Sequence, residues 1–417
     1  MSLTKENEVI YKRNVRAHEG PGEYLNQTFK RLKATKASRS RSFRVFVVFY
    51  CSCSGEELNG MKRFLCAYTF ILCCLFSLPS SLQALTVKDL LGRTVQVPKR
   101  AERIVAIGPG ALRLIVFLGA AGKVAGVEHG EKEWPPAGRP YRIAHPELAG
   151  LPIIGLAGPH PTPNPEAIIG VAPDIIFATY ISRKEADELQ ERTNRAVIVL
   201  SYGRLGCFYA KEIFRSLKIA GKALGKERRA GELIGFIEAA MEDLRQRVKG
   251  VPEADKPKVY VGALGFKGGH GIESTECDFP PFMALKARNV LGNCRGHRFV
   301  DKEFLLKADP DVIFLDLGNL HLVKQDYQRH RAFYSSLRAF KEGGVYGILP
   351  FNWYTTNVET SLADTYYIGK VLYPDRFREI DPEEKAREIF KFFVGRDVYS
   401  AMEAAYGGFG RIDSSRW

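Results

Sequence analysis

Short apolar segments alternate with amphipathic helical segments along the chain after residue 84. Runs of Val, Ile, Leu and Phe bounded by Gly, Pro and polar residues predict buried strands. They fall at 103–107, 124–127, 175–178, 196–200, 258–261, 312–315 and 345–349. Because helical periodicity occupies the intervals, as in 111–118, the pattern predicts α/β layers built on mainly parallel sheets. Residues 85–97 instead predict a β-hairpin that turns at Gly92-Arg93 and ends before Pro98.

One unit of this pattern occurs twice. Residues 164–177 read NPEAIIGVAPDIIF and residues 301–314 read DKEFLLKADPDVIF, so Glu166 matches Glu303 and a Pro-Asp pair recurs at the same offset. Each copy predicts a short helix, a turn at Pro-Asp that stops it, and a buried parallel strand. The repeat indicates two similarly built lobes. The alternative is a coincidence between two ordinary helix-to-strand junctions.

A helical segment without an internal proline separates the two copies. In residues 226–250, Leu233, Ile237 and Leu244 recur at helical spacing, with charged residues between them. At 1.5 Å per residue the segment would extend roughly 35 Å, enough to join two domains. A surface helix inside one domain is the alternative. The predicted fold class is therefore α/β, with two lobes that each hold a mainly parallel sheet flanked by helices, joined by one long helix. The predicted boundaries are an N-terminal lobe at 85–225, the interlobe helix at 226–250 and a C-terminal lobe at 251–417.

Residues 61–84 are typical of a cleavable signal peptide. Lys62 and Arg63 form a basic start, an apolar run extends from Leu65 to Leu78, and Ala84 suits cleavage. The run is shorter than the roughly 20 residues that span a bilayer. A buried helix or a membrane anchor is the alternative to export. Residues 1–60 show no sustained periodicity, and we interpret them as upstream sequence before a true start at Met61, or as a disordered tail.

Removing the leader changes the charge and the cysteine content. The full chain carries a formal net charge of +14, and residues 85–417 carry +7. A mildly basic surface is compatible with an anionic ligand but decides little. Of the eight cysteines, Cys207, Cys277 and Cys294 remain. In an oxidising compartment Cys277 and Cys294 are the pair closest in sequence, and whether they are bridged stays open.

Ligands of parallel α/β sheets bind beyond the carboxyl ends of the strands. The loops at these ends supply seven candidate ligand-binding residues: Arg113, Tyr180, Tyr202, Arg204, His270, Trp353 and Tyr354. Flat aromatic faces with cationic donors suit a bulky anionic chelate, such as a siderophore or tetrapyrrole. A molybdate or tungstate oxyanion held by Arg113, His270 and loop amides is one alternative. A periplasmic metal-dependent hydrolase or chelatase and a structural adhesin are the others.

Neither catalysis nor a bound metal is expected. The sequence contains no GxSxG, HExxH or paired Cys/His spacing, so we predict no catalytic residue, no protein-held metal and no cofactor. Direct metal ligation would require dispersed histidines or carboxylates to converge. They include His129, His145 and His160.

The PExI…PDIIF repeat, the long helix and the late NWY segment resemble the helical-backbone periplasmic binding proteins. These serve ABC importers of iron-siderophores, haem and cobalamin, and KGGHGIEST at 267–275 resembles a subgroup that binds metal complexes. The resemblance implies a monomeric, periplasmic receptor without enzymatic turnover. Its partners would be a small ligand and an ABC importer permease, with no nucleic acid and no membrane contact except through the permease.

Two site assignments follow from the resemblance alone. Glu166 and Glu303 match the acidic residues that dock on the permease, and Trp353 matches an aromatic residue that faces the ligand. The loop at 277–297 is longer than in the family, which leaves the size of the binding site and the identity of the ligand open.

Overall fold

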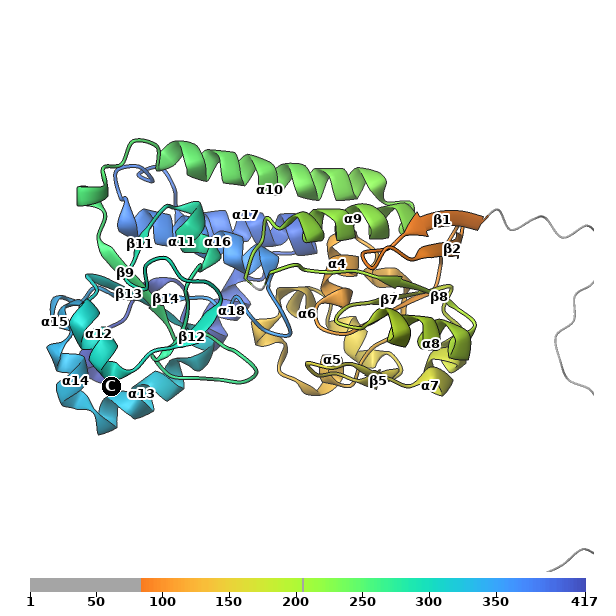
Figure 1. Cartoon of the computed structure of the whole chain (residues 1–417), viewed down its shortest axis with the longest axis horizontal. Coiled ribbons are helices and arrows are strands. Elements are labelled where there is room, and N and C mark those ends of the chain that lie inside the picture. The colour runs from red at the N-terminus through yellow and green to blue at the C-terminus, as the bar shows by residue number, and fades with distance from the viewer. Residues whose placement is uncertain (1–83, 205) are drawn as a thin grey trace, which may run out of the picture. The chain divides into compact units, whose positions relative to one another are not determined.

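The computed structural model describes residues 84–204 and 206–417 (Figure 1). The predictions for residues 1–60, and for the signal peptide up to its last residue, lie outside the described residues. Ala84, the predicted cleavage residue, is the first described residue and begins β1 (Ala84–Lys88). β1 pairs antiparallel with β2 (Thr94–Pro98), which is the hairpin expected from the alternating pattern.

The N-terminal half forms a four-stranded parallel sheet. Its order is β4 (Val124–Gly126), β3 (Ile104–Ile107), β7 (Ile175–Ala178) and β8 (Ala196–Val199). The helices of this half are α4 (Ala111–Phe117), α5 (Gly130–Glu133), α6 (Pro140–Ala144), α7 (Pro165–Val171), α8 (Arg183–Thr193) and α9 (Lys211–Leu224). A small antiparallel pair, β5 (Gly155–Leu156) with β6 (Thr162–Pro163), precedes α7.

The C-terminal half forms a separate five-stranded sheet. Its order is β11 (Arg288–Asn289), β9 (Lys258–Gly262), β13 (Val312–Asp316), β14 (Val345–Ile348) and β15 (Gly410–Arg411), and only β15 runs antiparallel to its neighbour. β10 (Ser274–Glu276) pairs with β12 (His297–Phe299) ahead of α12, much as β5 and β6 precede α7. The helices are α11 (Pro280–Ala284), α12 (Lys302–Ala308), α13 (Leu320–Arg329), α14 (Arg331–Ser336), α15 (Arg338–Glu342), α16 (Val358–Leu372), α17 (Pro382–Val394) and α18 (Tyr399–Tyr406).

The two copies of the repeat have the same local structure. Asn164 and Asp301 cap α7 and α12, each accepting a hydrogen bond from the backbone N–H three residues on. After each helix, the aspartate of Pro-Asp accepts from the first residues of the neighbouring central strand. Asp174 accepts from Arg103 N, and Asp311 accepts from Lys258 N. These bonds tie helix, turn and strand together in both lobes.

α10 (Glu227–Arg247) joins the two halves. Its 21 residues correspond to about 32 Å, and it runs beside α9 in Figure 1. Leu233, Ile237 and Leu244 are buried, as the helical spacing predicts. The two sheets are separate and mainly parallel, and one long helix connects them, so the predicted fold class is confirmed. The residue boundaries of the lobes stay a prediction.

Apolar packing explains why both lobes hold together. Because successive strand residues face opposite sides of a sheet, Ile104 joins a core shared with α10 and the second lobe, whereas Val105 joins a smaller cluster of the first lobe. Tyr260 and Ile313 likewise join a cluster restricted to the second lobe. Each sheet therefore has one face on the common core and one on its own.

A disulfide bond connects Cys277 to Cys294, which answers the question that the sequence left open. Cys207 is a buried free thiol. Within the described part of the chain, no helix combines the length and the apolar character that crossing a membrane requires.

Candidate functional site

The loops at the carboxyl ends of the strands contain several residues in unusual backbone conformations. Tyr180 follows β7, Ala263 and Lys267 follow β9, and Tyr354 and Thr355 follow β14, all with φ between 54° and 70°. Left-handed backbone is uncommon for residues other than glycine, and a β-branched residue such as Thr355 is an outlier there. Backbone strain of this kind clusters at functional sites. The position agrees with the rule that placed the candidate ligand residues here.

Residues 351–357 of the second lobe reach into the first lobe. Asn352 and Thr356 form an antiparallel bridge across this turn, and Arg113 from α4 donates to the main chain of the turn. The Arg113 Nη1 atom lies 2.7 Å from Thr356 O, and its Nη2 atom lies 2.9 Å from Trp353 O and 2.6 Å from Asn357 Oδ1. Arg113 is fully buried, so the structure places this candidate away from solvent.

Two tyrosines connect the same turn to the first lobe by their hydroxyl groups. The Tyr180 hydroxyl lies 2.7 Å from the Thr355 hydroxyl, although 48% of Tyr180 is exposed. Tyr354 donates to Glu128 Oε2 at 2.8 Å. Burial of Glu128 raises the pKa of its carboxyl to about 8, so the group is largely protonated at neutral pH. Tyr354 also packs edge-to-face on Trp134, at 5.1 Å between ring centroids.

Tyr202 and Arg204 differ in their surroundings. Tyr202 is buried and donates to Gly110 O at 2.9 Å, so its ring lies in the interior rather than at a ligand-facing surface. Arg204 is exposed and forms an ion pair with Asp278 from the second lobe. Glu276 lies nearby, and its burial, together with the negative charge of Asp278, raises the pKa of its carboxyl to about 7.

His270 belongs to an aromatic group on the second lobe. Its Nε2 atom lies 2.8 Å from Phe266 O, and its ring packs edge-to-face on Phe299, which is 56% exposed. Phe266 stacks on His297 at 4.0 Å. Trp353, the last candidate, is half-buried, and a Cβ added at Gly138 would lie 2.5 Å from its ring.

The sequence profile of the periplasmic binding proteins matches residues 104–350. The chain belongs to this family. Among curated relatives, the ABC transporter substrate-binding lipoprotein YvrC of Bacillus subtilis, itself uncharacterised, is 23% identical over 300 residues, covering 70% of this chain and 87% of YvrC. The molybdate-binding protein MolA of Haemophilus influenzae is 22% identical over 355 residues, covering 80% of this chain and 98% of MolA.

Solved structures of such proteins share the fold. A periplasmic solute binding protein from Veillonella parvula has a TM-score of 0.62 at 19% identity, covering 78% of this chain and 97% of that one. MolA of H. influenzae bound to molybdate has a TM-score of 0.60 at 20% identity, covering 75% and 98%. The family assigned from the repeat is thus confirmed, and so is the expectation of a binding protein rather than an enzyme.

In this periplasmic binding protein the candidate residues do not form one continuous group. Tyr180, Trp353 and Tyr354 lie together around the turn, and Arg113 and Tyr202 lie buried behind it. Arg204 and His270 have other neighbours. Sequence reasoning missed Trp134, Phe266 and His297. Trp134 was within reach, because it follows β4 at the same edge of the sheet as Glu128.

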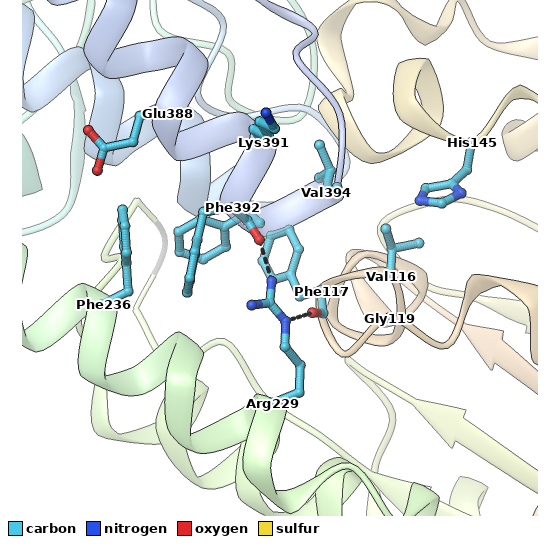
Figure 2. Close-up of a pocket in the computed structure, with 12 residues that line it drawn as sticks. Val116, Phe117, Gly119, His145, Arg229, Phe236, Glu388, Lys391, Phe392 and Val394 are labelled. Carbon is cyan, nitrogen blue, oxygen red and sulfur yellow. Dashed lines mark hydrogen bonds between the residues drawn. The ribbon is translucent and has the colours of Figure 1, made fainter.

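A pocket lies elsewhere, between α4, α10 and α17 (Figure 2). It has a volume of about 670 Å³, and four phenylalanines contribute to its lining, with Arg229 at its centre and His145 at its side. Arg229 donates to Phe117 O at 3.0 Å and to Phe392 O, which joins the first lobe to α17. The aromatic residues are Phe117, Phe236, Phe392 and Phe393. None of the seven candidates lines this pocket.

The described residues contain no group of three His, Cys, Asp or Glu side chains placed to hold a metal ion. His129, for example, accepts a hydrogen bond at its Nδ1 atom from the backbone N of Ala157, at 2.7 Å. His145 instead pairs with the neighbouring Glu147.

Proposed function

We propose that this protein is the substrate-binding component of an ABC importer and captures a compact metal chelate between its two lobes. The half-exposed aromatic side chains around the strained turn carry the proposal. Tyr180, Trp353 and Tyr354 come from both lobes and lie with Trp134 at the carboxyl ends of the strands. Flat rings with phenolic hydroxyl groups fit a bulky ligand that has both apolar faces and polar edges.

A ligand panel tests this proposal. We expect ferric siderophores, haemin or cobinamide to quench the fluorescence of Trp134 and Trp353 with a one-to-one stoichiometry. Trp417 is not part of the turn, because its ring packs on Tyr327 of α13 and Phe340 of α15. Replacing Trp417 with Phe should therefore leave the quenching intact. Absence of quenching and of binding heat across the panel would contradict a chelate ligand.

A molybdate or tungstate ligand is the second candidate, because the similarity to the molybdate-binding protein MolA extends over 98% of MolA. Against it, the donors of the best-placed arginine, Arg113, already bind Trp353 O and Thr356 O. An oxyanion would then depend on Arg204, His270 and backbone N–H groups. Calorimetry with molybdate and tungstate, run beside the chelates, separates the two ligand classes.

The proposed permease-docking surface has one acidic residue on each lobe. Glu166 and Glu303 are exposed in the first turns of α7 and α12. Ile169 and Leu306 follow at the same offset and are 46% and 43% exposed. Each docking site would thus pair a carboxylate with an aliphatic side chain, and two equivalent sites suit a permease with two equivalent subunits.

We further propose that the protein acts in the periplasm after removal of a leader at 61–84. A mature N-terminus directly after Ala84 would allow β1 to keep its pairing with β2. N-terminal sequencing of the exported protein tests the cleavage point. A mature chain that still begins at Met1 or Met61 would contradict it.

A further inference from the structure

Arg113 is charged and wholly buried, and it bonds to a segment more than two hundred residues away in sequence. Its two terminal nitrogens donate to Trp353 O, Thr356 O and Asn357 Oδ1 at 2.6 to 2.9 Å. The faces of its guanidinium group are covered by Tyr141 and Tyr202, at 5.0 and 6.0 Å from the ring centroids. The Nε atom is buried without a partner, but a ligand would have to break the bonds of both terminal nitrogens to be held by the guanidinium fork.

The carbonyl groups that Arg113 binds lie on either side of the strained residues. Trp353 precedes them and Thr356 follows them, while Tyr354 and Thr355 themselves have φ of 55° and 70°. Such a conformation persists only when the surroundings hold it. A planar guanidinium group can bind two carbonyls at a fixed separation, which the point charge of a lysine cannot do. Arg113 therefore clamps both ends of the strained turn.

The clamped turn presents the side chains of Tyr354 and Thr355 to the first lobe. Tyr354 meets Glu128 and Trp134, and Thr355 meets Tyr180. Gly110, at the start of α4, leaves room for the turn, since a Cβ there would lie 2.5 Å from Thr355 Cγ2. The position of Arg113 thus fixes where these groups lie relative to the first lobe.

We propose that Arg113 is a positioning residue, which holds the turn Trp353–Thr356 in its strained form and so aligns the ligand-facing side chains of the two lobes. That the aligned side chains face a ligand rests on the proposed function, whereas the clamp on the turn does not. It can be measured without a ligand, so a failure of the clamp and a failure of the chelate proposal are distinguishable.

Hydrogen exchange of the ligand-free protein tests the clamp. In Arg113→Gln we expect backbone amides of 352–358, such as Asn357 N–H bonded to Phe351 O, to exchange roughly ten- to hundredfold faster. Amides of β3 and β9 report the loss of global stability, and the acceleration at 352–358 under conditions where the protein stays folded is measured separately from it. Arg113→Lys keeps the charge but loses the planar group that binds two carbonyls, so its exchange rate at 352–358 should lie between those of the parent protein and Arg113→Gln. If Arg113→Gln does not fold, the Lys variant carries the test by the same comparison.

A matched control separates positioning from a general loss of stability. Arg93 is 5% exposed and also donates to a main-chain carbonyl, Val197 O, but all its partners lie in the first lobe. Arg93→Gln should not accelerate exchange selectively at 352–358. An unchanged turn in the Arg113 variants, or the same selective acceleration in Arg93→Gln, would overturn the proposal.

Relief of the strain gives a second, independent readout. Thr355→Gly removes the steric penalty of the left-handed conformation, so the turn should depend less on its clamp. We expect the effect of Arg113→Gln on exchange at 352–358 to be at least about threefold smaller in the Thr355→Gly background. An effect of equal size in both backgrounds would show that Arg113 does not act on the strained backbone.

Discussion

Arg113 and Arg229 each connect the two lobes by donating to main-chain carbonyls. Arg113, at the start of α4, binds the turn of the second lobe, whereas Arg229 on α10 binds Phe117 O at the end of α4 and Phe392 O on α17. The short helix α4, whose residues are all buried, is therefore tied at both ends.

The surroundings of these two junctions differ. Arg113 is fully buried, and the buried carboxyl groups of Glu359 and Glu128 lie at its junction, whose backbone is strained. Arg229 keeps a quarter of its surface exposed and lies 4.6 Å from the ring centroid of Phe392, beside an open pocket (Figure 2). A polar, strained junction specifies one geometry, whereas an aromatic junction beside a void tolerates adjustment. Directed polar contacts therefore fix the Arg113 junction, whereas packing and a pocket surround the Arg229 junction.

The largest expected effect is that of Arg113→Met on stability. Removing the guanidinium group leaves three acceptors and the carboxyl of Glu359 buried without their cation. We expect the free energy of unfolding to fall by about 3–5 kcal/mol, because several buried polar groups are left without a partner. Urea unfolding measures it. A loss no greater than that of Arg229→Met would contradict the difference between the two junctions.

The Arg113 junction should also contribute to the pH dependence of stability. Burial raises the pKa of Glu128 to about 8 and that of Glu359 to about 7, from an ordinary value of 4.5. The folded state therefore binds more protons than the unfolded state between pH 4.5 and 8, and stability falls as the pH rises through this window.

Glu128→Gln isolates one of these groups. Glutamine still accepts a hydrogen bond from Tyr354 but does not titrate. The free energy of unfolding, and with it the melting temperature, should therefore fall less steeply between pH 5 and pH 8. The change in slope stays below about 1.4 kcal/mol per pH unit, the limit for one proton. Melting curves across this range measure it. A slope identical to that of the parent protein would show that Glu128 does not titrate in the window.

Arg229→Met should have a smaller effect. The methionine side chain can keep the packing on Phe392, whereas the hydrogen bonds to Phe117 O and Phe392 O and the surface ion pair with Glu232 are lost at a partly exposed position. We expect a loss of about 1–2 kcal/mol in urea unfolding. Exchange at 352–358 should not change, because the Arg113 clamp is intact. Accelerated exchange there would show that the two junctions act as one.

Both junctions depend on contacts between residues far apart in sequence, whereas the features that could be predicted from the sequence are local. The strand at 175–178 was located to the residue, because a strand buried on both faces reads as a continuous apolar run. The Pro-Asp repeat predicted both lobes, because capping and turn chemistry are local. These features depend on neighbours in sequence.

The candidate site was harder to predict because its decisive contacts are long-range. The sequence placed Arg113 after a strand and predicted a ligand contact for it, and nothing local in the sequence indicates its bonds to the main-chain carbonyls of Trp353 and Thr356. The pocket around Arg229 arises where three helices meet. Neither the hydrogen-bond partners of a buried arginine nor a pocket between helices produces a periodic pattern in the sequence.

The smallest expected effect on stability is at the proposed docking surface, which touches neither junction. Glu303 is exposed, and Glu166 has only a surface ion pair with Arg192 at 3.5 Å. Replacing both glutamates with Ala should change the free energy of unfolding by less than about 1 kcal/mol and leave exchange at 352–358 as it was. Growth that depends on the imported ligand should nevertheless be lost if these residues dock on the permease. Since folding and the binding site would be unaffected, such a loss would locate the defect in delivery, whereas normal growth would remove Glu166 and Glu303 from the docking surface.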